Sequence, residues 1–86
     1  MIRYFFDIVI DDEITPDEEG LLLANIERAR HEATLSLAEI ARDQLRSTRT
    51  PRRISRLSIV VRTIEGPVSK HSLNGIRSSY SKPRHF

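Results

Sequence analysis

Hydrophobic and polar residues alternate near the start of the chain. The alternating hydrophobic positions are Tyr4, Phe6, Ile8 and Ile10. Aromatic and β-branched residues at every second position are typical of a strand with one buried face. The pattern therefore predicts a strand over residues 4–10.

A short polar stretch follows this strand. Asp11, Asp12 and Glu13 disfavour a strand and suit a turn, after which Ile14 and Thr15 would form a short second strand. Pro16 ends it or places it at an edge of the sheet, because proline has no N–H to donate to a neighbouring strand. The next residues, DEEG at 17–20, are expected to form a loop.

The spacing of hydrophobic residues changes to three and four after Asn25, which predicts an amphipathic helix. The apolar stripe consists of Ile26, Ala29, Ala33, Leu37, Ile40 and Ala41. Asn25 is expected to cap the helix, because its side-chain oxygen can accept a hydrogen bond from a free N–H of the first turn. Leu35 falls among the polar positions on the opposite face, so we expect it to be exposed.

The middle of the chain is dominated by arginine. Residues 46–56 read RSTRTPRRISR, with five arginines, one proline and no acidic residue. Neither helical nor strand periodicity is present, so we expect a basic loop. The arginines of this loop are candidate contacts for a phosphate or an acidic partner: Arg46, Arg49, Arg52, Arg53 and Arg56.

Alternation returns in residues 57–64, which predicts a third strand. The triplet Glu65, Gly66 and Pro67 would reverse the chain, and residues 68–73 would form a weaker edge strand. The serine- and arginine-rich residues 74–86 are expected to be a flexible basic tail.

The element order is therefore β-β-α-β-β, in one domain over residues 1–73. This order predicts a two-layer α+β fold with one helix packed on an antiparallel sheet. A single helix covers only one face of a sheet, so apolar residues on the other face form a candidate self-association face. Those residues are Phe5, Val9, Val60 and Ile64.

Three motifs in this order carry a family resemblance. They are RYFFD at residues 3–7, DEEG at residues 17–20 before an alanine-rich helix, and a terminal hairpin at Glu65-Gly66. Over about residues 2–73 they resemble a family of short alphaproteobacterial proteins, abundant in rhizobia, that open M-P-R-Y-F-F. That family is classed as a domain of unknown function. The resemblance implies a shared fold and a cytoplasmic setting, and it brings no catalytic residues.

The sequence departs from the family pattern in several places. Ile2 replaces the usual proline, Asp11-Asp12 replaces the common Asp-Gly turn, and the arginine loop and the tail are longer. A looser likeness to small antitoxins, which place a hairpin before one amphipathic helix, concerns architecture alone.

Composition limits the chemistry. The chain has 86 residues and no cysteine, which excludes disulfides, thiolate nucleophiles and thiolate metal sites. No hydrophobic run is long enough to span a bilayer, and a signal peptide's long apolar segment is absent from the first residues. We therefore expect a cytoplasmic protein without a membrane partner.

Candidate catalytic groups are few. The acidic residues between 11 and 19 do not fit the spacing of a calcium-binding loop, so we expect a solvated acidic turn. His71 lies close to Ser69 and Ser72 along one strand, where no third group or oxyanion-binding turn accompanies it. The three glycines are isolated, which excludes a phosphate-binding glycine loop. We expect no enzyme activity, no metal and no cofactor.

Charge is distributed unevenly. Residues 1–41 hold three arginines and ten acidic residues, net −7, whereas residues 42–86 hold eleven basic and two acidic residues, net +9. A basic segment of this kind suits a solvated loop, a contact with the acidic residues 11–19, an acidic protein partner, or nucleic acid. No aromatic residue interleaves with the arginines to stack on bases. We expect a self-associating protein-interaction or regulatory module, with nucleic-acid binding as the alternative.

Overall fold

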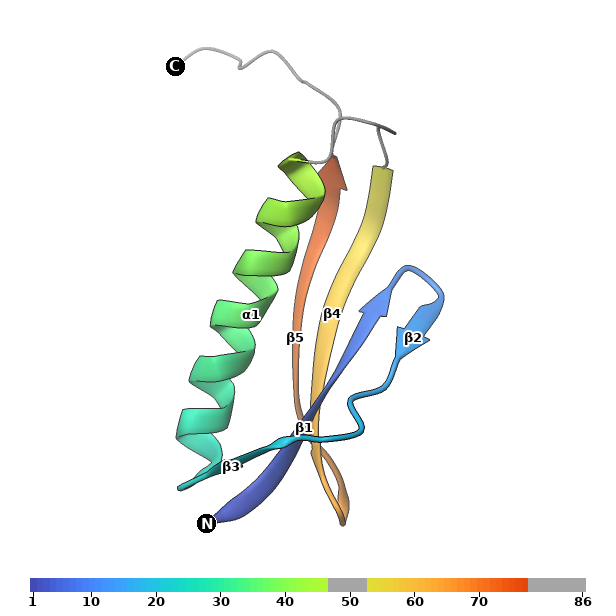
Figure 1. The fold of residues 1–86 in the computed structure, drawn as a ribbon. Helices are drawn as coiled ribbons and strands as arrows, with labels where there is room; N and C mark the ends of the chain where they lie inside the picture. Colours follow the sequence, from blue (N-terminus) through green and yellow to red (C-terminus); the bar gives the residue numbers. More distant parts are fainter. Residues whose placement is uncertain (47–52, 78–86) are drawn as a thin grey trace.

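The computed structural model describes residues 1–46 and 53–77. In that part of the chain, five antiparallel strands form one sheet and one helix packs against it (Figure 1). The elements are β1 (Ile2–Ile10), β2 (Glu13–Thr15), β3 (Leu21–Leu23), α1 (Ile26–Arg46), β4 (Arg53–Thr63) and β5 (Gly66–Arg77). The predicted α+β class is confirmed.

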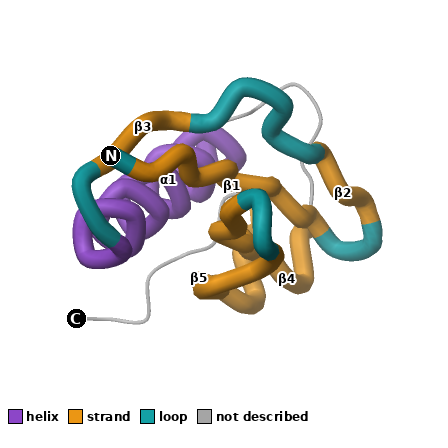
Figure 2. Tube along the Cα trace, turned by 90° about the horizontal axis from the view of Figure 1, so that it is seen from below, coloured by secondary structure: helices purple, strands orange, loops and turns teal. Residues whose placement is uncertain are grey.

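The order of the strands in the sheet is β2-β1-β4-β5, and β3 also pairs with β1. β2 pairs with Ile8–Ile10 and β3 pairs with Ile2–Tyr4, so the loop between them runs alongside the middle of β1. Figure 2 shows α1 to one side of the strands, in a second layer. The sheet therefore has one face under the helix and one face away from it.

The face under the helix carries the core. In the pairing of β1 with β4, Phe6 lies opposite Val61 and Ile8 lies opposite Ile59. Val61 and Ile59 are fully buried, and the alternating residues of β1 pack against the same cluster. The hydrophobic alternation predicted for residues 4–10 is thus the alternation that the sheet uses.

The helix presents mostly alanine to the sheet. Ala29, Ala33 and Ala41 are buried together with Leu37, and these small side chains allow the helix backbone to approach the strands closely. The side-chain oxygen of Asn25 accepts the N–H of Arg28 at 3.0 Å, which confirms the predicted cap. In residues 1–46 and 53–77, no helix is long and apolar enough to cross a membrane.

The observed strands differ from the prediction in several places, and β1 and β2 begin earlier than predicted, at Ile2 and Glu13. β3 was not predicted, because three leucines in a row show no alternation. β4 begins at Arg53 instead of residue 57, and β5 continues to Arg77, so parts of the predicted basic loop and tail are strand. Pairing between the two strands supplies backbone hydrogen bonds there, which side-chain propensity does not reveal. The rest of the predicted loop and tail, 47–52 and 78–86, lies outside the described residues.

The turn between β4 and β5 also differs. β4 ends at Thr63, which pairs with Gly66, so the turn consists of Ile64 and Glu65. The prediction that Ile64 lies on a strand face is therefore wrong. Register shifts by one residue after Val61, and Val68 is the extra residue of β5. An extra residue of this kind bends a strand and re-aims its side chains.

Candidate functional site

A polar network joins β1, β4 and the loop after β2. The Nε of Arg62 donates to the carboxylate of Asp7 at 2.7 Å, and a terminal nitrogen of Arg62 donates to the backbone oxygen of Asp17 at 3.0 Å. The N–H of Asp17 donates to the other carboxylate oxygen of Asp7 at 2.9 Å. These bonds fix the loop to the face of the sheet that points away from the helix.

The carboxylate of Asp17 accepts backbone hydrogen bonds in the interval of β1 that neither β2 nor β3 pairs with. It accepts hydrogen bonds from the N–H groups of Phe6, Glu19 and Gly20, at 3.0 to 3.1 Å. Partial burial raises the pKa of Asp17, but the three N–H donors and the charge of Arg62 outweigh that effect and leave its pKa below the usual value. An ionised Asp17 therefore bridges the interval between β2 and β3.

Gly20 allows the loop to return to β1. Its φ is +71°, and a Cβ at this position would lie 2.8 Å from the backbone oxygen of Tyr4. Only glycine fits both the backbone conformation and the close approach. The DEEG motif thus has two structural roles: Asp17 binds backbone N–H groups, and Gly20 allows the close approach to β1. The sequence alone predicted only a solvated loop at these residues.

The candidate self-association face is less apolar than the sequence suggested. The guanidinium of Arg62 lies over the ring of Phe5, 4.5 Å from its centroid, and Phe5 is half-buried. Val9 and Val60 are half-buried as well. Ile64, the fourth predicted residue, is 94% exposed and lies in the turn.

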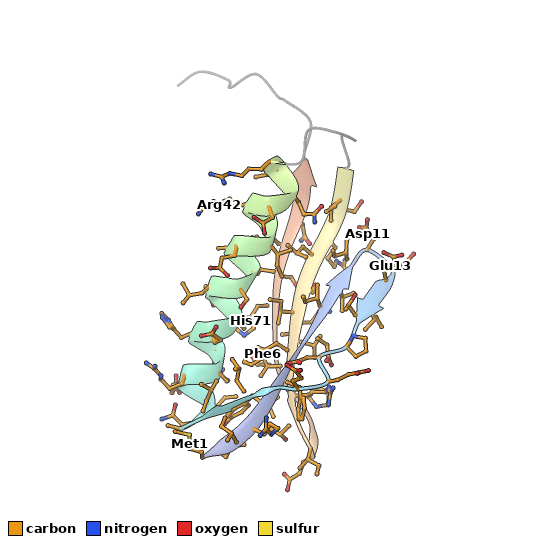
Figure 3. All side chains as sticks on the ribbon, viewed as in Figure 1. Met1, Phe6, Asp11, Glu13, Arg42 and His71 are labelled. Carbon is orange, nitrogen blue, oxygen red and sulfur yellow. The ribbon has the colours of Figure 1, made fainter. Side chains whose placement is uncertain are left out.

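Exposed hydrophobic residues instead gather at one end of the sheet, which we call the apolar end. This end comprises Met1, Ile2, Leu21, Leu22, Ile64 and Val68, all exposed. It brings together the start of β1, its partner β3 and the β4–β5 turn, at the bottom of Figure 1. Figure 3 shows Met1 at this end and Arg42 towards the opposite end of the molecule.

Two shallow hollows adjoin Ile64. One, of about 430 Å³, is lined mainly by apolar residues that include Tyr4, Ile26 and Val68. The other, of about 490 Å³, includes Phe5 and Arg62. Both share Ile2, Thr63 and Ile64, so the isoleucine stands between them.

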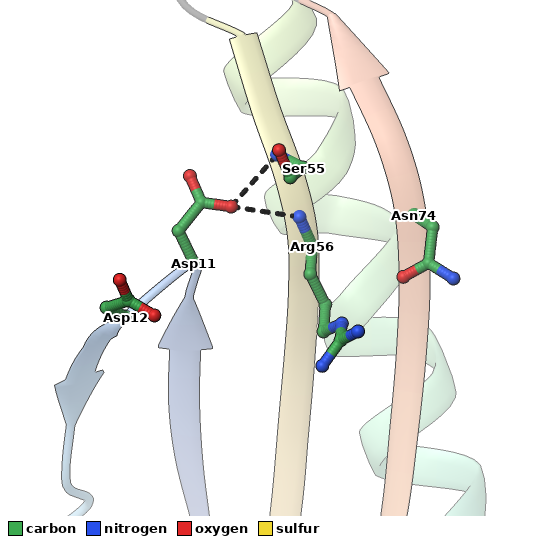
Figure 4. Close-up of a pocket in the computed structure, with 5 residues that line it drawn as sticks. All are labelled: Asp11, Asp12, Ser55, Arg56 and Asn74. Carbon is green, nitrogen blue, oxygen red and sulfur yellow. Dashed lines mark hydrogen bonds between the residues drawn. The ribbon is translucent and has the colours of Figure 1, made fainter.

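A polar hollow of about 500 Å³ lies towards the other end of the sheet (Figure 4). One carboxylate oxygen of Asp11 accepts the N–H groups of Ser55 and Arg56, at 2.9 and 3.0 Å. Consecutive N–H groups of a regular strand point in opposite directions. Two hydrogen bonds from neighbouring N–H groups to one oxygen therefore mark a local break in the regular backbone alternation of β4. Asp12 and Asn74 complete the lining.

The candidate arginines are placed as follows. Arg46 is the last residue of α1, and Arg56 is exposed at the polar hollow. Arg53 starts β4, directly opposite Arg77 of β5 in the register. The remaining two, Arg49 and Arg52, lie outside the described residues.

The structure brings two possible catalytic side chains together. The Oγ of Ser69 and the Nε2 of His71 are 2.8 Å apart, since residues two apart on a strand share a face. The sequence places Ser69 and His71 close together on one strand but predicts no catalytic triad there. A nucleophilic triad also needs a third group that orients the histidine. Among the described residues, no hydrogen bond joins His71 to such a group. Among residues 1–46 and 53–77, no three acidic or histidine side chains are placed to hold a metal ion.

The chain matches the model of a known protein family. Neither a curated protein nor a solved structure matches this chain. A protein-family model matches residues 3–68, which span β1 to the beginning of β5 and include the Asp7–Asp17–Arg62 network. The chain therefore belongs to the family described as a domain of unknown function, DUF6894.

Proposed function

We propose that this domain is a small, non-enzymatic protein-interaction module in the bacterial cytoplasm and that its contact surface is the apolar end. The exposure of Ile64 carries this proposal. Two-residue hairpin turns favour Gly, Asn and Asp, which tolerate the backbone geometry and water. An isoleucine that is 94% exposed in such a turn gains nothing from the fold of its own chain.

The neighbours of Ile64 strengthen the argument. A single exposed hydrophobic side chain is ordinary on a protein surface, whereas a contiguous group marks an interaction site. Ile2 and Val68 are exposed beside the same hollows. A partner that covers this end would remove several apolar side chains from water together, which is the main driving force of protein association.

Site-specific photo-crosslinking tests this function. A benzophenone amino acid replaces Ile64 in one variant and Leu35 in the control, because Leu35 is also exposed but lies on the outer face of α1. We expect a discrete crosslinked product at position 64 and none at position 35. Absence of any product at position 64, or the same product from both positions, contradicts the proposal.

Nucleic-acid binding is a second candidate function, supported by one observation. Arg56 is exposed and lines the polar hollow, so its guanidinium can reach a phosphate there. Asp11 and Asp12 line the same hollow and oppose a polyanion, which is why we place this function second.

A further inference from the structure

We propose that the partner on the apolar end is a second copy of this chain, related by a two-fold axis beside the β4–β5 turn. This inference rests on the proposed function, because it names the occupant of the same surface. A two-fold dimer requires a surface that is complementary to itself, in which a projecting group and its receiving site lie next to each other.

The shape of the apolar end meets this requirement. Ile64 projects from the turn, and the two hollows that could receive an aliphatic side chain begin directly beside it. A two-fold axis close to the turn would insert Ile64 of each copy into a hollow of the other. Ile2 and Val68, exposed in one copy, would then pack around the inserted side chain.

Charge complementarity argues for a second copy over an unrelated partner. Glu65 lines the hollow on one side of Ile64, and Arg3 lines the hollow on the other side. One terminal nitrogen of Arg3 donates to the backbone oxygen of Glu19, which leaves the positive charge of Arg3 without a carboxylate at that contact.

In the proposed dimer the two-fold axis runs between the two hollows, so the rotation exchanges the two sides of Ile64. It therefore sets Glu65 of each copy against Arg3 of the other, twice in the dimer. Arg62, which lines the same hollow as Arg3, is already bound to Asp7 and does not compete for Glu65. An apolar centre with opposite charges at its rim is the usual anatomy of a specific interface.

Sedimentation equilibrium of the purified chain tests the dimer through charge reversal. The variants are Arg3→Glu, Glu65→Arg and the double variant, which restores opposite charges across the axis. We expect each single reversal to weaken dimerisation at least about tenfold, and the double variant to recover most of that loss. Ile64→Ser should abolish the dimer, whereas Leu35→Ser and Glu39→Arg, on the exposed face of α1, should leave it unchanged.

The outcomes separate this inference from the proposed function. A wild-type chain that stays monomeric up to about 1 mM overturns the dimer, as does a double variant no better than the single ones. A crosslink from position 64 to a protein of different mass, with a monomeric chain, refutes the dimer and retains the interaction module. A monomer with no crosslink refutes both. Circular dichroism of every variant confirms that the fold is intact before its mass is interpreted.

Discussion

At the scale of single residues, two aspartates bind backbone N–H groups that no strand pairs. Asp17 accepts three of them beside the middle of β1, and Asp11 accepts two from β4 beyond the end of β1. A partly buried N–H group without a partner is costly, so the bond from the N–H of Phe6 to Asp17 stabilises β1 where neither β2 nor β3 pairs with it, whereas the two bonds to Asp11 are exposed. Asp11 also adopts a φ of +53°, a conformation that aspartate tolerates better than most residues.

The lowered pKa of Asp17 predicts acid sensitivity. A group whose pKa is lower in the folded state stabilises that state when ionised, and this stabilisation is lost as pH falls through roughly pH 4 and below. We expect Asp17→Asn to be less stable than wild type at pH 7, and the difference to shrink between pH 5 and pH 3. Urea unfolding at several pH values measures both quantities.

Glu18→Gln is the matched control for this prediction, because Glu18 is the exposed neighbour of Asp17. Its stability relative to wild type should change little with pH. A difference between Asp17→Asn and wild type that stays constant from pH 7 to pH 3 would contradict the assigned role of the carboxylate.

Gly20 predicts a second effect at residue scale. Gly20→Ala places a Cβ 2.8 Å from the backbone oxygen of Tyr4 and forces a non-glycine residue to a φ of +71°. We expect a loss of roughly 1–3 kcal/mol in the free energy of unfolding. Chemical denaturation measures it, and a variant as stable as wild type would mean that the loop does not return to β1 as described.

At the scale of elements, the stability of α1 depends on a narrow contact. Its buried face offers three alanines and one large side chain, Leu37. Ile40, on the same predicted stripe, is only half-buried. Leu37 therefore supplies a large share of the apolar surface that fixes the helix to the sheet.

We expect Leu37→Ala to destabilise the domain by about 2–5 kcal/mol, because the truncation leaves a cavity between α1 and the sheet. Ile40→Ala should cost less, and Leu35→Ala should stay within about 0.5 kcal/mol because that side chain is exposed. Denaturant melts of the three variants test the ranking. Equal losses at positions 35 and 37 would place the wrong face of the helix on the sheet.

Elements whose hydrophobic pattern repeats many times were predictable from the sequence. The helix repeats its apolar spacing over six positions and has a capping asparagine, and β1 alternates over seven residues. β3 has three residues and no period, and its pairing with Ile2–Tyr4 decides its conformation. The start of β4 was missed for the same reason, since arginine shows no preference that competes with pairing to β5.

The candidate site was predictable only in part. Ile64 was identified as an exposed apolar residue, but the one-residue error in the end of β4 placed it on a sheet face. The bonds from Asp17 to Phe6 and from Arg62 to Asp7 join positions 11 and 55 residues apart. Such contacts follow from register, which no local pattern specifies. The sequence motif DEEG, with its glycine before β3, was the available signal.

At the scale of the whole molecule, the two candidate surfaces are well separated. Ile64 follows the last residue of β4, and Arg53 is its first. An extended strand rises about 3.3 Å per residue, so these positions lie about 35 Å apart. A dimer formed at the apolar end would leave the opposite end of the sheet accessible in each copy, and the two functions need not exclude each other. We call this opposite end, where β4 begins at Arg53 and Arg56 lines the polar hollow, the arginine end.

Nucleic-acid binding through the arginine end predicts a defined salt dependence. Each phosphate that an arginine neutralises releases counterion, so affinity falls as salt rises. If the arginine end binds phosphate, replacing Arg53, Arg56 and Arg77 together by serine should reduce both affinity and the slope of log K against log salt, by about one unit per lost contact. Fluorescence anisotropy with a labelled duplex and a labelled single strand measures both and distinguishes the two forms of nucleic acid.

The matched control for this triple variant changes charge equally at another place. Arg28, Arg30 and Arg42 are exposed on α1, and replacing them by serine removes the same three charges. A site at the arginine end predicts a large change for the first triple variant and a small one for the second, because only the first removes contacts. Equal effects would mean that net charge alone attracts the oligonucleotide. A wild-type chain that binds neither form at physiological salt would refute the nucleic-acid function and leave the interaction module as the single candidate.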